Sequence, residues 1–230
     1  MSSRRSGRPS LCQLERPTDE GEAVTDDVWA MVHAERAALI DDLARLDDEQ
    51  WRRPSLCPGW TVHDVLAHLV DNARATRLGF LTGLVRARFD FDRLNSRGVE
   101  RARGAAPAET LERFRRAAPR TSAPPAPLDS RLVEELVHGE DIRRPLGLGR
   151  SYPPRAVERA LRLQARTPVA FGGAKELLTR VRITATDTDL ALGDGPAAEG
   201  PALSLLLAVT GRAAALDDLR GPGAAVLSGA

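Results

Sequence analysis

The sequence predicts an α+β protein, in which an N-terminal four-helix bundle is followed by a small α+β domain. Two observations support this fold class. Apolar residues recur at helical spacing through most of residues 26–144, whereas short segments of β-type pattern follow residue 151. The chain has 230 residues, 42% of them hydrophobic, which suffices for two compact cores. We expect a tail at residues 1–24, the bundle at 25–148 and the α+β domain at 149–230.

The helices of the first half are indicated by their period, caps and breakers. Thr61, followed three residues later by Asp64, is typical of a capping box at a helix N-terminus. The segment Pro119–Pro127 contains four prolines and cannot be helical. These features predict four helices, over residues 26 to about 50, 61 to about 87, 107 to 118 and 129 to about 144.

The second half mixes helix and strand signals. Pro153 and Pro154 are suited to opening a helix, and Gly200-Pro201 precedes a strongly apolar run. β-Branched residues lie on both sides of a Thr-Asp turn near Asp187. We expect helices over residues 153–165, 202–209 and 213–219, and two short strands within residues 178–192.

Composition excludes several classes of partner. There are 33 basic and 32 acidic residues along the chain, so no global field attracts nucleic acid or anionic lipid. The longest apolar run, Leu203–Val209, is too short to span a bilayer. Cys12 and Cys57 are too few for a disulfide framework. We expect a cytoplasmic monomer or homodimer that binds small molecules, and neither nucleic acid nor membrane.

Three residues on two predicted helices suggest a metal site. Glu134 and His138 are four residues apart, so both project from one side of their helix. His68 lies at the edge of the apolar face of another helix, and facing helices in a bundle often hold a metal between them. Two histidines and one glutamate leave one position open on a tetrahedral ion, which is typical of catalytic zinc.

The same three residues also have simpler interpretations. A Glu-x-x-x-His pair such as Glu134 and His138 is often a surface ion pair. Taken alone, His68 suits a partly buried histidine bonded to Asp64 or Asn72. The metal hypothesis therefore depends on both helices contributing together.

Other candidate residues are given structural interpretations. His63 lies on the opposite flank of its helix from His68, and we expect it to be solvated. His33 is expected to be structural. Cys57 precedes a helix, where a thiol can be reactive, but a small residue packed in a turn is the favoured interpretation. Gly59 is assigned to the turn and Trp60 to the core.

Two stretches carry a family resemblance. Residues 58–69 have the pattern Pro-Gly-Trp-Thr-Val-x-Asp-x-x-x-His-Leu, and residues 134–144 have Glu-x-x-x-His-Gly-x-Asp-x-x-Arg. Together they resemble the mycothiol-dependent maleylpyruvate isomerase family, whose N-terminal half is a DinB-like metal-binding bundle. Gly-x-Gly-Pro at 193–196, Gly-Pro-Ala at 200–202 and Leu-x-x-x-Thr-Gly-Arg at 206–212 resemble its sterol-carrier-like C-terminal domain.

The resemblance implies a reaction and its residues. It assigns the zinc ligands to His68, Glu134 and His138, and a catalytically important arginine to Arg212. It also implies that mycothiol, as a thiolate, binds Zn²⁺ or another divalent metal ion and adds to an activated double bond of the substrate. The sequence thus predicts a zinc-dependent, mycothiol-using isomerase or thiol transferase that acts on a small electrophile. The alternative is a non-catalytic metal-binding protein whose C-terminal domain binds an apolar ligand or a protein partner.

Overall fold

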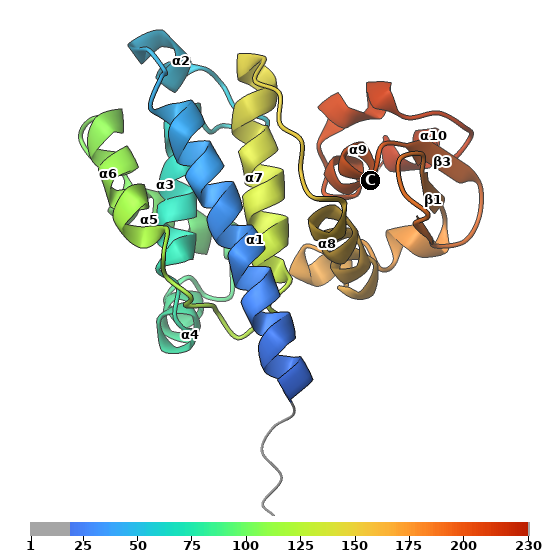
Figure 1. The fold of residues 1–230 in the computed structure, drawn as a ribbon, viewed down its shortest axis with the longest axis horizontal. Coiled ribbons are helices and arrows are strands. Elements are labelled where there is room, and N and C mark those ends of the chain that lie inside the picture. The colour runs from blue at the N-terminus through green and yellow to red at the C-terminus, as the bar shows by residue number, and fades with distance from the viewer. Residues whose placement is uncertain (1–18, 230) are drawn as a thin grey trace, which may run out of the picture.

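The computed structural model describes residues 19–229 and confirms the α+β fold class (Figure 1). Residues 1–18, most of the expected tail, lie outside the described part. The helical half comprises α1 Asp19–Leu43, α2 Asp48–Arg52, α3 Val62–Ala73, α4 Arg77–Arg86, α5 Phe91–Ala102, α6 Pro107–Ala117 and α7 Ser130–Leu146. The bundle therefore contains more helices than the four expected.

The helices of the bundle differ from the prediction in their bounds and in their number. The first helix begins at Asp19, inside the expected tail, and ends at Leu43; the short α2 follows from a capping box at Asp47. The expected second helix is two helices, because Thr76 caps a new one by accepting a hydrogen bond from the Gly79 amide. α5 was not expected, since its sequence is dominated by polar and charged residues.

α3 is the central helix of the bundle. The predicted capping box is confirmed, because the Thr61 side chain accepts from the Asp64 amide while the Asp64 carboxylate accepts from the Thr61 amide. α3 packs against α5, α6 and α7. The core around it is formed by Leu39, Leu43, Trp51, Val62, Val65, Leu66, Ala67, Leu69, Val70, Val99, Ala102, Leu111, Phe114 and Ile142.

The C-terminal half is a small α+β unit. Its elements are α8 Pro154–Arg166, η1 Val169–Phe171, η2 Leu177–Thr179, β1 Arg182–Ala185, β2 Ala191–Leu192, β3 Ala197–Gly200, α9 Ala202–Val209, η3 Ala213–Asp218 and α10 Ala224–Leu227. The sheet order is β2-β1-β3, with β2 antiparallel and β3 parallel to β1. β3 was not expected, because Ala-Ala-Glu-Gly has weak strand propensity. The expected last helix over 213–219 is a 3-10 helix.

The two halves share a core. Val28 and Val32 of α1 and Leu136 of α7 belong to the same buried cluster as Leu161 of α8 and Leu206 of α9. In Figure 1, α7 of the bundle and α8 of the C-terminal unit lie side by side where the two halves meet. α7, the helix with two of the predicted ligands, therefore contacts both halves. Within residues 19–229, none of the helices combines the length and apolar character needed to cross a bilayer.

Candidate metal centre

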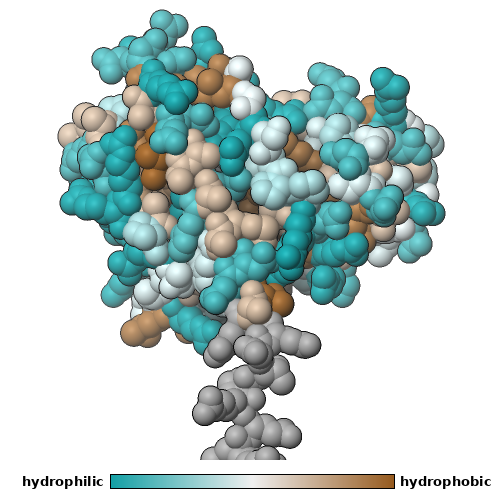
Figure 2. Space-filling view, in the orientation of Figure 1, coloured by the Kyte–Doolittle hydropathy of each residue, from teal (hydrophilic) through white to brown (hydrophobic). Residues whose placement is uncertain are grey.

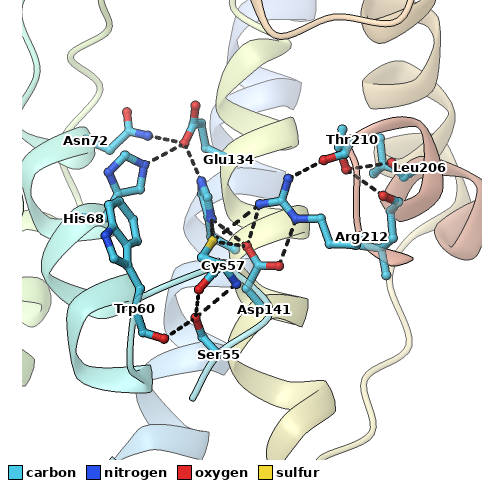
Figure 3. A network of polar contacts seen from close by, with 12 residues as sticks. Ser55, Cys57, Trp60, His68, Asn72, Glu134, Asp141, Leu206, Thr210 and Arg212 are labelled. Atoms are coloured by element: carbon cyan, nitrogen blue, oxygen red, sulfur yellow. Dashed lines mark hydrogen bonds and ion pairs between the residues drawn. The ribbon is translucent and has the colours of Figure 1, made fainter. Parts of the chain in front are cut away.

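The structure brings the three predicted metal ligands together. His68 Nε2 lies 3.4 Å from Glu134 Oε2, and His138 Nε2 lies 3.3 Å from the same oxygen. The two imidazole rings are in edge contact, with centroids 4.7 Å apart. One donor atom from each residue falls within 4.8 Å of the others. Figure 3 shows His68 on α3 facing Glu134 on α7.

Local structure fixes the direction of each ligand. Trp60, held in the turn before α3, places its ring 5.2 Å from that of His68 and covers one side of it. Gly59 makes this turn possible because its φ of +77° is left-handed, as expected for a turn glycine. Trp60 itself is half-buried at the edge of the bundle core. The i, i+4 spacing on α7 directs Glu134 and His138 to one side, as predicted.

Asp141 orients His138. The Asp141 Oδ2 atom lies 2.8 Å from His138 Nδ1, so the carboxylate holds a proton on Nδ1 and turns Nε2 towards Glu134. A carboxylate behind a histidine is the usual way in which proteins orient a metal-binding imidazole. Asp141 is the aspartate of the motif at 134–144, but the sequence analysis gave it no role of its own.

A second group of residues orients Glu134. The Asn72 amide donates to Glu134 Oε2, and Arg131 in turn donates to Asn72 Oδ1. Asn72 lies one turn after His68, so α3 supplies both a candidate ligand and a group that holds another. Neither Asn72 nor Arg131 was predicted to be part of the site.

The site strongly favours positive charge. Burial alone would raise the pKa of Glu134, but hydrogen bonds from His138 and His68 outweigh it and hold that pKa well below its ordinary value. Burial likewise opposes protonation of His138, yet hydrogen bonds with Asp141, Cys57 and Glu134 raise its pKa well above the ordinary value. The carboxylates therefore stay ionised and attract either a proton or a metal cation to this position.

The donor set fits a divalent metal ion. Two imidazole nitrogens and one carboxylate oxygen converge, which is a common catalytic zinc set. His138 has the expected supporting carboxylate, whereas His68 Nδ1 is buried without a hydrogen-bond partner among the described residues. The metal hypothesis thus stays a prediction that the geometry supports.

Arg212 reaches the site from the C-terminal unit. Its Nε and Nη2 atoms contact the two oxygens of Asp141 at 3.0 and 2.7 Å, and Nη1 donates to the Thr210 carbonyl at 2.6 Å. Figure 3 shows this arginine extending towards Asp141 and Cys57. Burial works against the charged carboxylate, but His138 and Arg212 outweigh it and lower the pKa of Asp141. In the structure Arg212 contacts Asp141 and none of the three candidate ligands directly. Its catalytic role stays a prediction.

Cys57 lies beside the candidate centre rather than alone in its turn. Its Sγ is 3.0 Å from Asp141 Oδ2, 3.7 Å from His138 Nδ1 and 3.6 Å from Arg212 Nη2. Cys57, His138 and Asp141 also have the spacing of a metal set. The Arg212 guanidinium already supplies the cation there, so the His68, Glu134 and His138 set is the better metal site.

The prediction that His63 is solvated is wrong. Its side chain is buried, with Nε2 2.7 Å from the Thr110 hydroxyl and Nδ1 accepting from Arg103 Nε at 3.2 Å. The reason is α5, which was not expected and which packs with α6 over this flank of α3. His33 stacks on Trp29 with ring centroids 5.9 Å apart and is remote from the candidate ligands in its contacts, consistent with its structural assignment.

Comparison with known proteins supports the family resemblance of the sequence. Residues 32–131 match the family model described as the mycothiol maleylpyruvate isomerase N-terminal domain. The predicted resemblance to the mycothiol-dependent maleylpyruvate isomerase family is confirmed. No curated protein sequence matches the chain significantly.

Two solved structures have the same fold over most of their length. One is the crystal structure of the mycothiol-dependent maleylpyruvate isomerase, with 13% sequence identity and a TM-score of 0.60. The other is a histidine-to-alanine mutant described by the same name, with 12% identity and a TM-score of 0.62. Each comparison covers 86% of this chain and 92% of the other. The likeness to this isomerase fold therefore includes the C-terminal unit.

Proposed function

We propose that the protein is a metal-dependent, thiol-using isomerase or transferase that acts on a small electrophile, with mycothiol as the thiol. The observation that carries the proposal is the convergence of His68, Glu134 and His138 at the junction of the bundle and the C-terminal unit. The shared fold with a mycothiol-dependent maleylpyruvate isomerase supports the choice of thiol and reaction. We propose zinc as the metal, since the donor set is one that zinc prefers.

The ligands and their partners divide the work. His68, Glu134 and His138 would hold the ion, and Asp141 and Asn72 keep the imidazole and the carboxylate correctly turned. A bound divalent ion supplies the positive charge that lowers the pKa of a thiol and makes the thiolate available near neutral pH. No protein nucleophile is then needed, so Cys57 is assigned no covalent step.

Arg212 is proposed to orient the electrophile. Asp141 accepts hydrogen bonds from Nε and from one N–H of Nη2. Two donors are then left for a substrate: one N–H of Nη1, and the second N–H of Nη2, whose nitrogen lies 3.6 Å from Cys57 Sγ. These are the donors from which a substrate carboxylate or carbonyl oxygen can accept. A bidentate clamp that uses Nε and Nη2, by contrast, would require Asp141 to release the guanidinium.

Metal content tests the proposal first. We expect about one zinc per chain in protein purified without chelator, and loss of that zinc in His138→Ala. His33→Ala is the matched control, because it removes a histidine outside the candidate centre and should retain the metal. A panel of activated-alkene electrophiles is then assayed with mycothiol, with another thiol and without thiol.

The outcomes separate the proposal from its alternative. Thiol-dependent turnover that disappears in His138→Ala supports the enzyme. A metal-loaded protein without thiol-dependent turnover across the panel would instead favour a non-catalytic protein that binds an apolar ligand or a partner.

A further inference from the structure

We propose that the α4–α5 side of the bundle is a docking surface for an anionic lipid bilayer. The surface is defined by the outward face of α4, the turn after it and the arginines around them. It is independent of the metal centre and of the proposed reaction. Our expectation from composition, that the protein does not bind membranes, rests on charge averaged over the whole chain.

α4 presents an unusually apolar outer face. Leu78, Leu81 and Val85 are spaced three and four residues apart, so they share one side of the helix, and they are 73%, 51% and 62% exposed. The opposite side meets α5, where Gly83 lies against Leu94. α4 has no buried residue at all. Leu78, Leu81 and Val85 are therefore available to an external partner, whereas Phe80 of the same helix is half-buried against Phe91.

The turn after α4 extends this apolar face. Phe89 is 70% exposed and adopts a φ of +62°, next to Arg88 at +59°. A bulky residue rarely takes this left-handed conformation, which costs about 1–2 kcal/mol per residue. Phe91, 40% exposed, follows at the start of α5. Phe89 thus stands exposed at the end of the α4 face, and Phe91 exposes part of its ring there while contacting Phe80 with ring centroids 6.5 Å apart.

Positive charges outnumber negative ones around the face. Residues 74–92 contain four arginines and two aspartates, Asp90 and Asp92, both at the start of α5, whereas the whole chain has a net charge of only +1. At about 100° per residue, Arg77 and Arg86 lie on either side of the apolar face. Within residues 19–229, no ion pair involves Arg77, Arg86 or Arg88. An apolar strip between free arginines is the pattern of an interfacial membrane helix.

A recess beside the face suits a lipid headgroup. It has a volume of about 300 Å³ and lies between α4 and α5, with Arg86, Arg97 and Arg101 in its wall together with Gly79 and Gly83. Arg101 is paired with Asp71 at 3.3 Å, whereas Arg97 contacts the Arg86 carbonyl and has no acidic partner in the described part of the chain. In Figure 2, brown surface lies at the lower left, where Figure 1 places α4.

Charge complementarity favours a bilayer over a second copy of the chain. A two-fold contact between identical faces would bring the same four arginines of both copies together, with only Asp90 and Asp92, at the start of α5, to offset them. An anionic bilayer offers negative headgroups to the arginines and acyl chains to the apolar side chains. The structure thus assigns this surface to phosphatidylglycerol- or phosphatidylserine-type membranes.

Vesicle co-sedimentation of the full-length protein tests the proposal. We expect binding to vesicles that contain anionic lipid, little binding to pure phosphatidylcholine, and weakening at high salt. Phe89→Asn removes the aromatic ring but suits the left-handed backbone, and it should weaken binding several-fold. Phe171→Asn is the matched control, because Phe171 is also 70% exposed but lies in the C-terminal unit; it should bind as the unmodified protein does.

A charge-reversal pair tests the electrostatic part. Arg77→Glu with Arg86→Glu should abolish binding, since each basic residue near an anionic surface contributes roughly fivefold in affinity. Arg162→Glu with Arg166→Glu on α8 changes net charge equally and should leave most of the binding. Equal binding to neutral and anionic vesicles, or equal losses in the two pairs, would overturn the proposal. So would a concentration-dependent dimer that Phe89→Asn dissociates, because it would assign the face to a second copy.

Discussion

Replacing Asp141 by asparagine tests the link between the candidate metal centre and the C-terminal unit. Its carboxylate, fully buried, contacts His138 at 2.8 Å and Arg212 at 3.0 and 2.7 Å. Asp141→Asn keeps the shape but removes the charge that both partners use. Breaking a buried ion pair costs about 3–5 kcal/mol. We expect the lower end, about 3 kcal/mol, because Arg212 keeps the Thr210 carbonyl and part of its contact with solvent.

The expected effects are measurable at neutral pH. The lowered pKa of Asp141 means that its stabilisation is fully present above the unfolded value of about 4 and is lost only as the pH falls through the lower folded value. At pH 7 the full loss should therefore appear, as a drop in Tm of roughly 6–12 °C for a chain of this size. Loss of the carboxylate behind His138 should also weaken metal binding by about 10–100-fold.

The assay is thermal unfolding of metal-free and metal-loaded protein, with metal affinity from a chelator competition. Both the metal-free and the metal-loaded protein are measured because bound metal raises the apparent stability by itself. Asp217→Asn is the control, since Asp217 is exposed and should change unfolding by less than about 0.5 kcal/mol. If Asp141→Asn matches this control in both Tm and metal affinity, the proposed coupling is refuted.

Three further predictions address other parts of the structure. Burial, followed by the charge of Arg103, lowers the pKa of His63, so the free energy of unfolding should fall as the pH drops from about 6.5 towards the lower pKa of the folded state. His63→Gln should remove that pH dependence, as measured by denaturant unfolding. Leu66→Ala, at a fully buried position of the bundle core, should cost about 2–5 kcal/mol in the same assay. Arg212→Lys cannot reproduce the two contacts with Asp141 and should reduce kcat/KM while metal content, by elemental analysis, stays unchanged.

Much of the fold and the convergence of the three candidate ligands were accessible from sequence because their signals are local. The capping box at Thr61 fixes the start of α3, and helical spacing places Glu134 and His138 on one side of α7. The apolar run of α9 likewise gave its bounds directly. Each of these depends on residues within one or two turns of each other.

The missed parts depend on contacts between distant segments. α5 has few apolar residues, and it packs closely on α3 through Gly98, which lies against Asp71. Without α5, the flank of α3 that carries His63 looked exposed. β3 has poor strand propensity, and its hydrogen bonds to β1 define it instead.

The surroundings of the candidate centre were missed for a related reason. Asn72, Arg131 and Asp141 act through hydrogen bonds whose partners lie on other elements or across a helix turn, and nothing in their residue type marks them. Cys57 was placed in a turn, but its contact with Arg212 spans 155 residues of sequence. Such contacts follow only from the tertiary arrangement.

The most direct test of the central claim is zinc-edge X-ray absorption of the metal-loaded protein with and without mycothiol. We expect only nitrogen and oxygen ligands without thiol, from His68, Glu134, His138 and solvent, and one sulfur ligand at about 2.3 Å after thiol is added. A sulfur ligand already present without thiol would place Cys57 on the metal and contradict the assigned ligand set. A spectrum unchanged by saturating mycothiol would contradict the proposed use of the open position.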